Sequence, residues 1–109
     1  MRIQIAARKC DIPDSVRSRT EEQLGKLNKY EPHLSAAEVV YQTEKHRKKV
    51  EAILNVGRGD PVVASGEGAE FQEALDSMVD RLTRMLKRRR SQQTDHHGRG
   101  LDKTAPIED

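Results

Sequence analysis

The chain has 109 residues and a net charge of only +2, although 35% of its residues are charged and 34% are apolar. This length suits one domain with a single core, and the low apolar content predicts a thin core under a heavily charged surface. The single cysteine excludes an intramolecular disulfide, and no apolar run is long enough to span a membrane. We therefore expect a cytoplasmic protein.

The N-terminal third predicts a strand followed by a helix. Residues 2–7 alternate in polarity, which places their two isoleucines on one face of a strand. Pro13 suits the first turn of a helix, and Pro32 prevents its continuation beyond about Tyr30. Between the prolines a narrow stripe recurs at spacings of three and four, at Val16, Thr20, Leu24 and Leu27.

Three more strands are predicted in the middle of the chain. Residues 37–43 and 50–56 alternate with period two, which is typical of half-buried strands. A turn within residues 44–49 connects them. Residues 57–60 predict a second hairpin loop, and residues 62–65 begin a fourth strand.

The last predicted element is an amphipathic helix over residues 71–90. Its apolar side chains recur at spacings of three and four, at Phe71, Ala74, Leu75, Met78, Leu82, Met85 and Leu86. After Arg90 this periodicity is lost, so we expect a folded domain of residues 1–90 and a mobile polar tail of residues 91–109.

The predicted order is β-α-β-β-β-α. It indicates an α+β fold in which two helices cover one face of a four-stranded sheet. The opposite face is expected to stay open, with Val40 and Ile53 on it.

Charge is segregated along the chain. Every charged residue from 60 to 80 is acidic, whereas residues 81–90 carry six cations and no acid. On a wheel of about 100° per residue, Arg81, Arg84 and Arg88 gather away from the apolar stripe. Compensation of the helix dipole accounts for one or two such charges but not for six. We interpret this helix end as a surface for a polyanion.

A second basic run, residues 45–49, lies where the second and third strands meet. Its cations can reach phosphates, although protection of a sheet edge would also explain them. The chain has only two tyrosines and one phenylalanine, and at least two of these belong to core stripes, so no platform for stacking bases is expected. This favours folded RNA, recognised by its shape and phosphates.

Three segments carry a family pattern. They are residues 24–30 (LGKLNKY), residues 44–47 (EKHR) and residues 74–88 of the last helix. The pattern resembles the ribosome hibernation-promoting factor family, also called ribosome-associated inhibitor or ribosomal subunit interface protein, in its short form.

The resemblance implies a fold like a double-stranded RNA-binding domain, and it also implies a mechanism. Such a protein docks on 16S ribosomal RNA of the 30S subunit, free or within the 70S ribosome, in the channel used by messenger and transfer RNA. It inhibits translation by occlusion during stress or stationary phase. A monomer when free is expected, with no cofactor, no small-molecule substrate and no membrane partner.

By position, the resemblance also assigns RNA contacts to basic side chains of this chain. They are Lys26, Lys29, Lys45, Arg81, Arg84 and Arg88, with Arg47, Lys48 and Lys87 as helpers.

The two alternative classes of function are an enzyme and a protein-binding module. Against an enzyme, the two acidic residues at 21–22 are adjacent on a helix and face different directions, so they do not form a catalytic pair. Residues 57–59 and 66–68 lack the lysine of a phosphate loop and are predicted to be turns. The histidine pair at 96–97 supplies too few ligands for a metal site. The other alternative is a regulatory module whose basic surface docks on an acidic protein.

Overall fold

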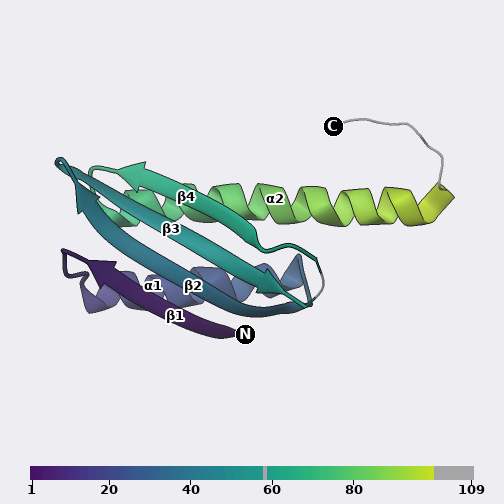
Figure 1. Ribbon diagram of the computed structural model, residues 1–109, viewed down its shortest axis with the longest axis horizontal. Coiled ribbons are helices and arrows are strands. Elements are labelled where there is room, and N and C mark those ends of the chain that lie inside the picture. Colours follow the sequence, from purple (N-terminus) through teal and green to yellow (C-terminus); the bar gives the residue numbers. More distant parts are fainter. Residues whose placement is uncertain (58, 100–109) are drawn as a thin grey trace.

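The computed structural model contains a four-stranded sheet with two helices on one face (Figure 1). It describes the backbone of residues 1–57 and 59–99 and side chains up to residue 91. The elements in chain order are β1 (Arg2–Arg8), α1 (Asp14–Gly25), the 3-10 helix η1 (Lys26–Lys29), β2 (Leu34–Glu44), β3 (Arg47–Val56), β4 (Val62–Gly68) and α2 (Phe71–Arg99). The predicted α+β class and element order are confirmed.

The order of the strands in space is the order in the chain, β1-β2-β3-β4. The β2–β3 and β3–β4 pairs are antiparallel, whereas β1 runs parallel to β2. A parallel pair needs a long crossover connection, and α1 supplies it. The sheet is therefore mixed, and β1 and β4 are its two edges.

The core lies between the sheet and the helices. Period-two alternation buries one face of β2 and β3, and α2 lays its apolar stripe on that face. The side chains at most 1% exposed include Val39, Tyr41, Val50, Leu54, Leu75, Met78, Leu82 and Leu86. Val40 and Ile53 lie on the opposite face and are half-buried, as the alternation predicted.

β4 continues through Gly68, where the sequence predicted a turn at residues 66–68. Gly66 is buried on the face that α2 covers, and a Cβ added there would lie 2.6 Å from Met78 N. The helix therefore rests directly on the strand backbone. The prediction of a turn was wrong because glycine serves here for close packing, not for a reversal of the chain.

Both helices differ in length from their predictions. The final turn of the first helix is the 3-10 helix η1, a common ending for an α-helix. α2 continues past Arg90 to Arg99. A helix that is already nucleated gains one hydrogen bond for each further residue, so it needs no apolar stripe to continue. Residues 91–99 are thus helical, residues 100–109 lie outside the described part, and the mobile tail stays a prediction.

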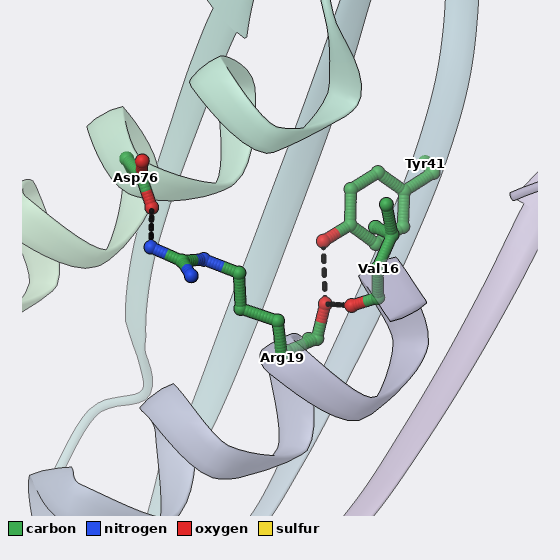
Figure 2. A network of polar contacts seen from close by, with 5 residues as sticks. Val16, Arg19, Tyr41 and Asp76 are labelled. Atoms are coloured by element: carbon green, nitrogen blue, oxygen red, sulfur yellow. Dashed lines mark hydrogen bonds and ion pairs between the residues drawn. The ribbon is translucent and has the colours of Figure 1, made fainter. Parts of the chain in front are cut away.

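One polar contact is buried between α1 and β2. The hydroxyls of Thr20 and Tyr41 lie 2.6 Å apart, and Thr20 also donates to the backbone oxygen of Val16 at 2.7 Å (Figure 2). Since the single proton of the threonine hydroxyl is used in this way, the tyrosine hydroxyl donates to Thr20. This contact explains why the stripe of α1 contains a fully buried threonine.

We expect Tyr41→Phe to change how stability depends on alkaline pH. Burial raises the pKa of Tyr41 above its ordinary value of 10.0. The stability due to this raised pKa is complete below pH 10.0 and is lost as the pH rises above it, because the unfolded chain then ionises first. The substitution should also cost about 1 kcal/mol at neutral pH through the lost hydrogen bond.

Urea unfolding followed between about pH 8 and pH 11 measures this effect. Tyr30→Phe is the matched control and should retain the alkaline loss of the native chain. A Tyr41→Phe variant whose alkaline loss equals that of the control would contradict the assignment.

Candidate nucleic-acid interface

The first group of predicted cations lies along the middle of α2. Arg81, Arg84 and Arg88 are all exposed, as the helix wheel predicted, and we call them the arginine row. They line a groove together with residues of β3 and β4, so they face the β4 edge of the sheet. Arg84 lies 2.6 Å from Asp80, but the two side chains are 72% and 58% exposed. An exposed pair of this kind is weak, so Arg84 remains available to an anion.

The second group surrounds Tyr30 on the other side of α2. The Nζ atoms of Lys29 and Lys87 lie 5.2 and 5.3 Å from the centre of the Tyr30 ring. Arg90 donates to the backbone oxygen of Lys29 at 3.0 Å and thereby links α2 to η1. Lys26 is exposed on the same short helix. We call Lys26, Lys29 and Lys87 the lysine cluster.

The third group, the hairpin cations, lies at the turn between β2 and β3. Lys45 occupies the turn itself with a left-handed φ of 48°. Arg47 contacts Glu67 at 3.2 Å, and the Nζ of Lys48 lies 5.1 Å from the ring of Phe71, the first residue of α2. The hairpin cations therefore sit at the beginning of α2, and the other two groups sit near its middle.

The predicted cations thus form three groups and not one continuous surface. From Phe71 to the arginine row α2 rises by roughly 15 to 25 Å, at 1.5 Å per residue. The arginine row and the lysine cluster flank the same part of α2, whereas the hairpin cations offer a separate contact. A polyanion touching all three groups must be a structure of comparable size.

The sequence from residue 3 to residue 94 matches the family described as Sigma 54 modulation protein / S30EA ribosomal protein. The chain belongs to this family. Several curated relatives are named ribosome hibernation promoting factor. The one from Azotobacter vinelandii is 30% identical over 107 residues, which are 98% of this chain and 99% of that protein. The one from Escherichia coli K12 is 27% identical over 96 residues, 88% of this chain and all of that protein.

Two solved structures share the fold. A ribosomal subunit interface protein from Coxiella burnetii gives a TM-score of 0.77 at 22% identity, covering 84% of this chain and 99% of that one. The N-terminal domain of Protein Y from Thermus thermophilus gives 0.73 at 29% identity, covering 81% and 98%. The family resemblance is confirmed, and the likeness to a double-stranded RNA-binding domain stays a prediction.

Two arginines that the prediction of RNA contacts left out have structural contacts near the same surface. Arg89 donates to the backbone oxygen of Asp60 at 3.2 Å, and Arg90 makes the contact with Lys29 described above. Each one attaches α2 to a neighbouring loop or turn. These contacts hold α2 against the domain, and no local sequence signal could have identified the two carbonyl partners.

Met85 corrects a prediction about the core. The spacing placed it in the apolar stripe of the last helix, but it is 37% exposed and lines the groove beside the arginine row. Position 85 lies on the wheel between the stripe and the row. On that side α2 meets only β4, an edge strand, so the sheet does not extend far enough to cover the methionine.

The aromatic side chains are distributed as the sequence suggested. Tyr41 is fully buried and meets Phe71 edge to face, with ring centres 5.5 Å apart. Tyr30 is half-buried between lysines. In the described part of the chain, no helix is long and apolar enough to cross a membrane. Three or more potential metal-binding side chains do not come together anywhere in that part.

Proposed function

We propose that this chain is a ribosome hibernation factor that binds the small ribosomal subunit and inhibits translation by occlusion. The family, and the names of relatives that align over nearly their whole length, support a ribosomal role. The observation that carries the binding surface is the placement of exposed cations on two sides of the middle of α2. In this proposal the protein acts in the cytoplasm, where it meets idle ribosomes.

The three basic groups would contact phosphates of 16S ribosomal RNA. Each group is fixed to the folded domain through α2, η1 or the β2–β3 hairpin, so the distances between groups are set before binding. RNA that is itself folded presents phosphates at fixed positions, and such a match gives both affinity and orientation. The body of the domain would then fill space that messenger and transfer RNA need. Occlusion of this kind requires no catalytic group.

A second candidate is docking on an acidic protein. The family description includes sigma 54 modulation, which is regulation of a protein partner. The same exposed cations would serve that purpose. The two candidates differ in how binding responds to salt, because RNA releases condensed counterions when phosphates are neutralised.

Co-sedimentation on sucrose gradients tests the proposal. The purified chain should migrate with 30S subunits and 70S ribosomes, remain at the top with 50S subunits, and be displaced by transfer RNA. Neutralising about five phosphates should give a slope near −4 for log affinity against log salt. A chain that stays at the top of a 30S gradient even at low salt would refute the proposal and favour the acidic protein partner.

A further inference from the structure

A groove runs between the arginine row and the edge of the sheet. Its volume is about 410 Å³, within the range of roughly 300 to 1,000 Å³ that is usual for small-ligand sites. One wall is α2 with the arginine row and Met85, and the other is the β4 edge of the sheet, where Val63 and Ser65 of β4 and Glu51 of β3 lie on the face turned away from α2. A second hollow of about 380 Å³ also contains Met85 and Arg88 and extends toward Pro61. The two hollows together suit an extended ligand.

The groove contains an exposed apolar pair. Val63 is 45% exposed and Met85 is 37% exposed, and within the described residues the only other exposed large apolar side chain is the terminal Met1. The groove thus has apolar side chains on both walls and three guanidinium groups beside them. This combination suits a ligand in which a flat ring is joined to a negatively charged group. A methionine thioether packs well against aromatic rings, and arginine planes stack on bases.

Glu51 has no evident role in a surface for phosphates alone. It is exposed on the open face of the sheet, across the β4 edge from the arginine row, and forms no ion pair with any described residue. A carboxylate repels phosphate, but it accepts hydrogen bonds from the amino groups of nucleobases. Ser65 is its direct partner in the β3–β4 ladder and adds a hydroxyl that can donate or accept.

We propose that this groove binds a short unpaired stretch of RNA and prefers bases with an exocyclic amino group over uracil. The arginine row would hold the flanking phosphates, Val63 and Met85 would contact the face of a base, and Glu51 would accept from its amino group. The inference rests on the proposed function for RNA as the partner. It adds a base contact to an interface otherwise expected to recognise shape and phosphates.

Short oligonucleotides of cytidine and of uridine, about six nucleotides long, test the inference by fluorescence anisotropy. The native chain should bind oligocytidine about fivefold more tightly, the effect of one hydrogen bond. Glu51→Ala should remove this preference without weakening the binding of oligouridine, because the variant also loses a repulsive charge. If Glu51 served only the fold, its substitution would weaken the binding of both oligonucleotides equally.

Met85→Ser should weaken the binding of both oligonucleotides about tenfold, which is the effect of one lost base contact. The slope of log affinity against log salt should stay unchanged, because no phosphate contact is lost. Ala6→Ser, exposed on β1 at the sheet edge opposite β4, is the control and should bind like the native chain.

Equal binding of the two oligonucleotides by the native chain, with no effect of Met85→Ser, would overturn the groove inference even if the chain still migrates with 30S subunits. A Met85→Ser variant that binds oligonucleotides normally but no longer migrates with 30S subunits would also overturn it, since the groove would then contact a protein. Failure of the native chain to migrate with 30S subunits would instead reject the proposed function itself.

Discussion

Reversal of the arginine row, by Arg81→Glu, Arg84→Glu and Arg88→Glu together, should abolish ribosome binding and leave the domain folded. A hydrogen bond between an arginine and a phosphate is worth roughly 1.5 to 3 kcal/mol, so the loss of three should weaken binding about a thousandfold or more. Repulsion between the new carboxylates and phosphates adds to this loss. Co-sedimentation with 30S subunits measures the change directly.

The fold should survive because the row contributes little to it. All three side chains are exposed, and the one ion pair among them, between Arg84 and Asp80, is exposed on both sides. Such pairs are worth about 0 to 1 kcal/mol. Circular dichroism of the variant should therefore match that of the native chain. An unfolded variant would show that the row supports the fold, and its failure to bind would then carry no information on RNA contact.

A control with the same change in net charge separates position from overall charge. Arg2, Arg8 and Lys9 are exposed on or directly after β1, the sheet edge opposite β4. Their joint reversal to glutamate lowers the net charge equally but leaves all three basic groups intact. This variant should retain most of its ribosome binding. If it loses binding as fully as the row variant does, net charge and not the arginine row governs the interaction.

The secondary structure was largely predictable because its signals are local. The stripe that includes Leu75, Met78 and Leu82 follows the helix period, and all three are fully buried in the structure. Strands β2 and β3 followed from alternation over residues 37–43 and 50–56. In each case the side chains that define the period also form the core, so local pattern and tertiary packing agree.

Features that depend on contact between distant segments were not predictable in the same way. Nothing in residues 2–7 indicates that β1 pairs with β2 in parallel. From the sequence alone Gly66 suggests a turn, and its role in packing becomes visible only once its contact with Met78 is known. The exposure of Met85 likewise depends on where the sheet ends, which the helix period cannot show.

The candidate site shows the same division. Exposure of the arginine row followed from the helix wheel alone. The meeting of Lys29 with Lys87 at Tyr30 did not, because it depends on how η1 packs against α2. The assignment of these side chains to RNA came from the family pattern and remains a proposal, since position on a surface does not identify the ligand.

Gly66→Ala is expected to be the most destabilising of the glycine-to-alanine substitutions in the described part of the chain. The new Cβ would clash with Ala74 O and lie 2.6 Å from Met78 N. Both are backbone atoms of α2 and cannot rotate away, so the helix must move off the strand. Overpacking of a core costs roughly 1 to 3 kcal/mol, and we expect a loss near the upper end of this range.

Gly25→Ala is the matched control for this substitution. Gly25 has a helical φ of −60°, and a Cβ there would meet no atom within 4 Å. Alanine should therefore raise stability by about 0.5 to 1 kcal/mol, through its higher helix propensity. Urea denaturation of the two variants should give changes of opposite sign. Equal small effects would mean that α2 does not rest on the backbone of β4.

The Gly66→Ala variant also links the fold to the proposed interface. The arginine row belongs to α2, and the opposite wall of the groove belongs to β3 and β4, so a helix displaced from β4 changes the distance between the walls. Under conditions where the variant is still folded, its binding of oligocytidine should fall while the exposed charges are unchanged. Loss of stability with fully native RNA binding would mean that the row acts without the strand beside it, as a set of charges on one helix.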